Sequence, residues 1–131
     1  MSGEKNLKAL LRQMQPVLHD APYGYGVILT GQPIPAANVF AQIAEAEGTT
    51  FVALQTELAA LGIAGGDAWA RISLHVHSDL TAVGLTATIS AALTVENISA
   101  NVVAGYFHDH IFVQWDRRFD AMTALRALTD A

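Results

Sequence analysis

Hydrophobic positions recur along the first part of the chain in two different patterns. Leu7, Leu10 and Leu11 follow helical spacing, and we predict a helix that ends at residues 16–19, with His19 at its end. Residues 23–29 instead alternate between large apolar and small side chains, which predicts a strand. Glycine, proline and asparagine are concentrated in residues 30–38, so a loop is expected to follow this strand.

Residues 39–54 carry conflicting signals. Their alanine and glutamate content favours a helix, whereas the Glu47-Gly48 pair resembles a hairpin corner and residues 49–53 are rich in β-formers. We interpret the segment as a hairpin of strands 39–45 and 49–54. A short helix over 57–61 should then end at Gly62.

The second half has a clearer pattern. Residues 69–76 alternate, with Ile72, Leu74 and Val76 on one face of a strand and Arg71, Ser73, His75 and His77 on the other. Leu85, Ile89 and Leu93 define a helix that Asn97 closes, and strands 99–107 and 111–115 follow, joined at residues 108–110. A last helix from residue 116 is expected to turn Phe119, Met122, Leu125 and Leu128 inward.

This order, β-α-β-β-α, is the beginning of a ferredoxin-like unit. The first half repeats it weakly, since each half contains a hairpin followed by a helix. We therefore predict an α+β protein of two ferredoxin-like units, with antiparallel sheets and helices on one face. The units are expected at 1–65 and 66–131, divided at Gly65-Gly66, with a strand of the N-terminal half, for which 23–29 is the candidate, completing the second unit.

The composition excludes several classes of protein. The chain of 131 residues has no cysteine, so disulfides, cysteine-based zinc sites and thiolate nucleophiles are ruled out. Its net charge of −5 argues against nucleic acid as a partner. Charged residues make up 15% of the chain, against about 25% in ordinary soluble domains. So few charges predict that part of the surface is an interface, as in a homodimer or other homo-oligomer.

Membrane insertion is not expected, because no stretch approaches the roughly 20 apolar residues that a spanning helix needs. The N-terminal residues are charged and lack the apolar core of a signal peptide. The sequence alone therefore predicts a cytoplasmic protein.

Two segments of the second half, RISLHVHSDLTAVGLTATIS and ISANVVAGYFHDHIFV, resemble the tandem ACT-domain proteins. These are small bacterial stand-alone proteins similar to the regulatory domains of aspartate kinase and to the animal arginine sensors. The resemblance covers residues 69–129 well and residues 1–62 more weakly. It implies ferredoxin-like units that associate through their sheets and bind amino acids at the seams between them.

The resemblance also implies a set of ligand-binding residues. The family's ligand loop and helix start match Ser78, Val83, Gly84, Leu85 and Thr86, and the region of its second strand matches Asn101, Val102, Gly105, Tyr106 and Asp109. Gly105 and His108 differ from the residues of the arginine sensors, so the identity of the ligand does not transfer.

Elementary geometry points to the same edge. In a ferredoxin-like sheet, the end of the first strand adjoins the corner between the second and third strands. The helix that starts near Gly84 lies at that edge too, where its free N–H groups favour a carboxylate. Asp109 would supply a negative charge for an ammonium group. A zwitterion such as an amino acid requires both signs within a few ångströms.

The histidines leave two alternatives open. His75, His77, His108 and His110 form two H-x-H pairs that the topology brings together, so they could hold a metal or serve a metal-assisted hydrolase. Ring directions across the tight corner disfavour convergence, and polar lining of a sheet face is the simpler interpretation. The third possibility is a pure protein-interaction module.

No nucleophile elbow, phosphate loop or cofactor fingerprint is present in the sequence. We therefore expect no enzyme, no catalytic residues and no cofactor. The expectation is a regulatory or sensor protein that binds an amino acid at a seam between ACT units. A regulated protein is its further expected partner.

Overall fold

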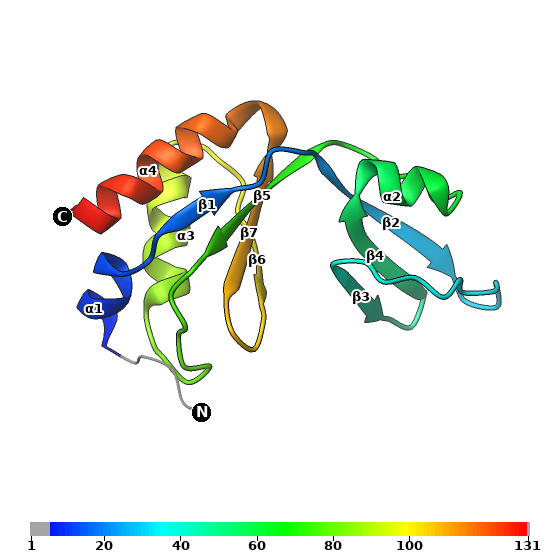
Figure 1. Cartoon of the computed structure of the whole chain (residues 1–131), viewed down its shortest axis with the longest axis horizontal. Helices are drawn as coiled ribbons and strands as arrows, with labels where there is room; N and C mark the ends of the chain where they lie inside the picture. Colours follow the sequence, from blue (N-terminus) through cyan, green and yellow to red (C-terminus); the bar gives the residue numbers. More distant parts are fainter. Residues whose placement is uncertain (1–5, 131) are drawn as a thin grey trace. The chain divides into compact units, whose positions relative to one another are not determined.

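A computed structural model describes residues 6–130, which form two compact units (Figure 1). Residues 21–69 form what we call the inserted unit. Residues 6–20 and 70–130 together form the terminal unit. From residue 6, the chain thus runs through the terminal unit, leaves it for some fifty residues and returns to it.

The inserted unit is a three-stranded antiparallel sheet with one helix. It contains β2 (Tyr23–Leu29), β3 (Ala41–Ala44), β4 (Gly48–Leu54) and α2 (Gln55–Ala60), in the strand order β3-β4-β2. Trp69, the first residue of β5 (Trp69–Leu74), pairs with Tyr23 at the edge of β2. A small core of Phe51, Ala53, Leu58 and Ile63 fixes α2 on one face. Gly24 and Gly26 leave the space that Gln55 and Ile63 occupy against that face.

The terminal unit has a four-stranded sheet in the order β1-β5-β7-β6. Its strands besides β5 are β1 (Pro16–Leu18), β6 (Asn101–Ala104) and β7 (Asp109–Gln114), and its helices are α1 (Leu7–Arg12), α3 (Leu85–Val95) and α4 (Arg118–Asp130). The main core of the protein lies between this sheet and the helices, with Ile72, Leu74, Leu93, Ile111 and Leu125 fully buried. The four strands and two long helices reproduce the complete ferredoxin-like arrangement.

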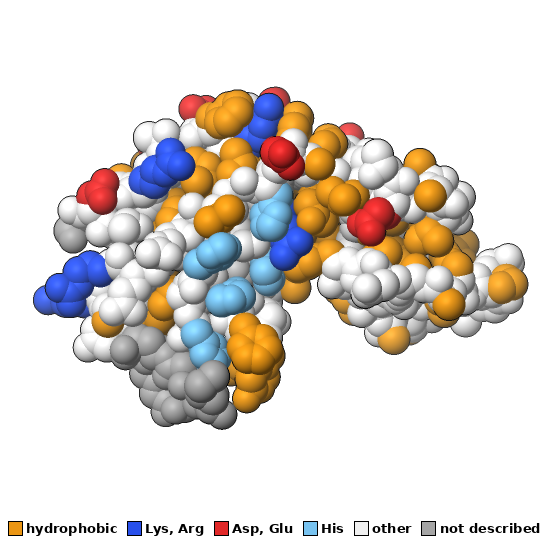
Figure 2. Space-filling view, in the orientation of Figure 1, with side chains coloured by type: hydrophobic (Ala, Val, Ile, Leu, Met, Phe, Trp, Pro, Cys, Tyr) orange, Lys and Arg blue, Asp and Glu red, His pale blue; other side chains and the backbone are white. Residues whose placement is uncertain are grey.

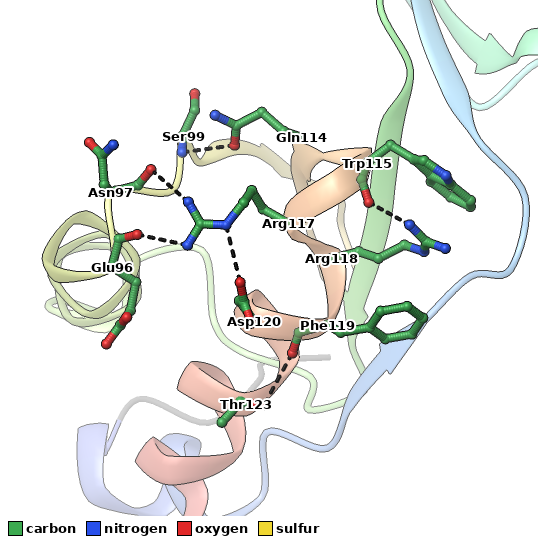
Figure 3. Close-up of polar contacts among 10 residues, drawn as sticks. All are labelled: Glu96, Asn97, Ser99, Gln114, Trp115, Arg117, Arg118, Phe119, Asp120 and Thr123. Carbon is green, nitrogen blue, oxygen red and sulfur yellow. Dashed lines mark hydrogen bonds and ion pairs between the residues drawn. The ribbon is translucent and has the colours of Figure 1, made fainter.

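A short 3₁₀ turn, η1 (Trp115–Arg117), joins β7 to α4 and ties it to the end of α3. The guanidinium of Arg117 donates to the carbonyl oxygens of Glu96 (2.9 Å) and Asn97 (3.3 Å) and pairs with Asp120 (Figure 3). These carbonyls lie at the C-terminus of α3, where a cation interacts favourably with the negative end of the helix dipole. Arg117 therefore satisfies the end of one helix from the beginning of the next.

The predicted α+β architecture of ferredoxin-like units is confirmed. Residues 39–54 contain the predicted hairpin, although their composition favours a helix. A strand of the N-terminal half does complete the sheet of the second unit, but it is not the candidate 23–29. Residues 16–18 form β1 and pair with β5, and His19 follows this strand, whereas we expected a helix end there. Residues 23–29 pair with β4 along their whole length. Because β1 belongs to the sheet of the second half, residues 6–20 form a compact unit with residues 70–130, and residues 21–69 form the other.

One side chain of the last helix was assigned to the wrong face. Phe119 is 64% exposed rather than inward, and Ala121 is buried in its place. The guanidinium of Arg118 lies over both the Trp115 ring (3.9 Å) and the Phe119 ring (4.5 Å), which holds Phe119 at the surface. Phe119 fits the helical spacing of the buried residues, but its ring belongs to the cation–π stack and not to the core.

Candidate functional site

The loop between β5 and α3 and the start of β7 form a small pocket in the terminal unit. Its volume is about 90 Å³. The lining residues are Ser78, Asp79, Leu80, Ala82, Leu85, Thr86, Ala104 and Asp109. The pocket is smaller than the 300–1,000 Å³ of drug-sized ligand sites, so it fits the polar head of a small molecule.

Hydrogen bonds within the loop fix the polar groups of this pocket. The buried Ser78 hydroxyl donates to Oδ2 of Asp109 at 3.2 Å. Oδ1 of Asp79 accepts from the backbone N–H and the hydroxyl of Thr81, which closes an Asx turn. Two carboxylates therefore border the pocket in defined orientations.

The positive side of the pocket is the N-terminus of α3. Gly84 precedes the helix with a φ of 102°, a left-handed conformation that favours glycine, and its carbonyl accepts the Thr88 N–H at 2.9 Å. The N–H groups of the first turn, before Thr88, have no acceptor within the helix, because no helical carbonyl precedes them. An anionic group at Leu85 and Thr86 would meet these N–H groups and the positive end of the dipole.

The structure brings four of the ten predicted ligand residues together, namely Ser78, Leu85, Thr86 and Asp109. Gly84 adjoins them at the helix start. Val83 is 84% exposed, and Asn101 is exposed on the edge strand β6. Val102 faces the other way and packs against the core.

The remaining two predicted residues lie in the turn before β7. Gly105 donates its N–H to the carbonyl of His108, a contact that leaves little space for a side chain. Tyr106 is exposed and touches Phe107 and His77 rather than the pocket. Asp79, Leu80 and Ala82 also line the pocket and lie within residues 78–86, the loop and helix start that the family resemblance matches. Ala104, at the end of β6, is the lining residue that sequence reasoning missed, because alanine carries no polar signal.

The histidines gather on the sheet face of the terminal unit that its helices leave open (Figure 2). The hydroxyl of Ser73 lies 2.8 Å from Nε2 of His19 and 2.8 Å from Nδ1 of His110. An N–H of Arg71 reaches the same Nδ1 at 3.3 Å. Because Arg71 can only donate, this nitrogen is an acceptor and the His110 ring is neutral, with its proton on Nε2.

Burial is the main cause of the lowered pKa of both bonded histidines. It lowers the pKa of His110 to about 4, helped by the charge of Arg71 and by the neighbouring His108, His19 and His75. The pKa of His19 is lowered for the same first two reasons. Both rings therefore act as neutral hydrogen-bonding groups at physiological pH.

The other histidines pack ring against ring. His75 stacks on His108 with ring centroids 5.7 Å apart, and His77 lies against Phe107 at the same distance. Within residues 6–130, no group of three or more histidine and acidic side chains converges in a way that could hold a metal ion. Among the described residues, the histidine cluster therefore provides no set of ligands for the metal alternative.

Comparison with known families follows the two halves of the chain. One ACT-domain model matches residues 2–70, more than half of the chain, and another matches residues 65–127. The chain belongs to the ACT-domain family. The family supports a regulatory, ligand-binding role. The two ACT matches follow chain order, whereas residues 6–20 of this ACT protein lie in one compact unit with its second half.

Solved structures extend the comparison. A Vibrio cholerae protein of unknown function, described as a possible transport protein, shares 35% identity and a TM-score of 0.79, with 98% of this chain and 99% of that one covered. An Agrobacterium tumefaciens protein is 14% identical, with a TM-score of 0.73 and coverage of 89% and 90%. The regulatory subunit of Thermus thermophilus aspartate kinase is 13% identical, with a TM-score of 0.61 and coverage of 88% and 98%.

The comparison with curated proteins gave no match. The helices among residues 6–130 include none with the length and apolar character needed to cross a membrane.

Proposed function

We propose that this ACT-domain protein is a regulator that binds a free amino acid, or a similar zwitterion, in the pocket of the terminal unit. The proposal rests on one observation: a pocket of about 90 Å³ is lined both by the positive N-terminus of α3 and by the Asp109 carboxylate. The N-terminus of α3 would take the carboxylate, and Asp109 would take the ammonium group. Membership of the ACT-domain family supports the same role.

The pocket accommodates the zwitterionic head and leaves the ligand's side chain outside. Leu80 is 65% exposed and Val83 is 84% exposed beside it, so apolar surface is available at the rim. A further ACT unit packed against this rim would complete the enclosure and read the side chain. Ligand binding would then favour one packing of units over another, which is how a protein without catalytic residues regulates a partner.

The first prediction concerns ligand binding to the folded protein. Each of the twenty amino acids is added at millimolar concentration, and the melting temperature is measured by differential scanning fluorimetry. At least one should raise it, because a ligand present at 100 times its Kd stabilises the native state by about 2.7 kcal/mol. Asp109→Asn should remove the increase while keeping the shape of the pocket.

The control is Asp116→Asn, which removes the same charge at an exposed position of η1. This variant should respond to the amino acid as the native protein does. If no amino acid shifts the melting temperature, or if Asp109→Asn responds fully, the proposed site is wrong.

A further inference from the structure

The two units of the chain carry different charges. The inserted unit contains the acidic residues Glu45, Glu47, Glu57 and Asp67 but no lysine, arginine or histidine. Every histidine and every basic residue of the protein lies in the remaining segments of the sequence. The inserted unit therefore carries acidic side chains alone, whereas the terminal unit carries both signs, including every basic side chain that an acidic segment of a second copy could meet.

Each unit also presents an open sheet edge. In the terminal unit, β1 has β5 as its one strand neighbour within residues 6–130. Val17 lies opposite Ser73, and the N–H of His19 donates to the Arg71 carbonyl at 2.9 Å, so these odd-numbered residues bond toward β5. Backbone groups alternate in direction along an antiparallel strand. The Pro16 carbonyl and both polar groups of Leu18 consequently face outward.

One edge strand of the inserted unit is β3, which pairs with β4. The N–H of Glu45 donates to the Gly48 carbonyl, so the odd-numbered residues of this strand also bond inward. The backbone groups of Gln42 and Ala44 therefore face outward, with the same two-residue spacing as those of Pro16 and Leu18. The side chain of Ile43 is 44% exposed between them.

A groove of about 510 Å³ runs between the outer edge of β1 and α4. Leu18, Met122 and the exposed Phe119 supply apolar walls, and Arg126 lies at one end. That end is the Pro16 end, because the last turns of α4 lie beside α1, which precedes β1 (Figure 1). Lys8 and Arg12 of α1 share a second groove there with Leu128. The start of β1 is thus the basic end of the groove.

We propose that β3 of a second copy adds to the edge of β1 as an antiparallel strand. Leu18 then pairs with Gln42 and Pro16 with Ala44, and the missing N–H of Pro16 leaves three main-chain hydrogen bonds. In this register, Val17 (39% exposed) meets Ile43 side by side. The acidic turn that holds Glu45 and Glu47 falls at the basic end of the groove. Antiparallel pairing thus satisfies hydrogen bonds, apolar contact and charge together.

This interface joins two different surfaces, so it is distinct from a symmetric pairing of like edges or of sheet faces. It does not depend on the proposed amino-acid ligand. Each copy has one edge of each kind, and blocking either edge in every copy abolishes the contact. A mixture of the two blocked forms retains one intact contact.

Disulfide trapping tests the register directly, because the native chain has no cysteine. Full-length Val17→Cys and Ile43→Cys are mixed and oxidised under mild conditions. The two residues would form a non-hydrogen-bonded pair, whose Cα separation suits a disulfide. The control pair is Val17→Cys with Val27→Cys, since Val27 is 53% exposed on the same unit but lies on β2, on the opposite side of its sheet from β3. We expect about tenfold more mixed dimer from the first pair; equal yields, or none, overturn the proposal.

Sedimentation velocity of Val17→Glu and Ile43→Glu provides an independent test. Both positions are partly exposed, and unchanged melting temperatures will show that the variants fold. The native protein should self-associate with rising concentration, each variant alone should stay monomeric, and their equimolar mixture should form dimers. A monomeric native protein, variants that still associate, or a mixture that stays monomeric contradicts β3-to-β1 addition.

Discussion

At the scale of single residues, the Ser73 hydroxyl between two neutral imidazoles couples stability to pH. The pKa of His110 is about 4 in the folded chain and has its ordinary value of 6.5 when unfolded. Between these values the unfolded chain binds a proton that the folded chain does not. The stabilising contribution is therefore present above pH 6.5 and is lost as the pH falls toward 4.

The second prediction follows from this sign. Urea unfolding at pH 7.5 and pH 5.0 should give a lower free energy of unfolding at pH 5.0. His110→Gln should make this difference smaller, even though the variant loses bonds to Ser73 and Arg71 and is less stable at both pH values. His77→Gln, at a ring that packs on Phe107, should keep the native difference. An unchanged pH dependence in His110→Gln would refute the assignment.

At the scale of elements, Arg117 joins the end of α3 to the start of α4. The third prediction is that Arg117→Ala lowers the free energy of unfolding by about 1 kcal/mol, the typical contribution of a cation at a helix C-terminus. Asp120→Ala removes the ion pair but keeps the bonds to the helix end. Because exposed ion pairs contribute little, this variant should lose less than about 0.5 kcal/mol. Equal losses in thermal or urea unfolding would show that the ion pair, not the cap, matters.

Local pattern predicted most elements because their signals are local. The alternation of residues 69–76 and the spacing of Leu85, Ile89 and Leu93 each describe one buried face, and both appear in the structure. The strand at 16–18 was missed because three residues carry too little periodicity, and its pairing with β5 depends on contacts more than fifty residues away. Strand choice in a sheet is a tertiary property that local propensity does not encode.

Part of the candidate site could also be predicted from the sequence. Ser78, Leu85, Thr86 and Asp109 meet because a ferredoxin-like sheet brings its loop, helix start and hairpin to one edge. Within the hairpin, however, one residue of shift decides which side chains face the edge. Asp109 begins β7 and faces the pocket, whereas Tyr106 lies in the turn before it and faces solvent. A pattern that fixes strands only to within two residues cannot make that distinction.

At the scale of the whole molecule, the inserted unit leaves and re-enters the terminal unit at neighbouring points. The N–H of His19 donates to the carbonyl of Arg71 at 2.9 Å, next to both crossing points of the chain. The fourth prediction is that replacing residues 21–69 by a short glycine-serine linker leaves the terminal unit folded. Its main core contains no residue of the deleted segment. Cooperative thermal unfolding and dispersed amide NMR signals should be retained, and a collapsed, non-cooperative product would contradict the prediction.

The same connectivity determines the order in which strand partners become available during synthesis on the ribosome. β5 is translated some fifty residues after its partner β1, and α4 later still. The strands of the inserted unit are neighbours along the chain, so their loops close sooner and at lower entropic cost. Residues 21–69 can therefore become compact while β1 (Pro16–Leu18) still lacks its partner strand. The nascent chain would compact the unit without basic side chains first and close its main core last.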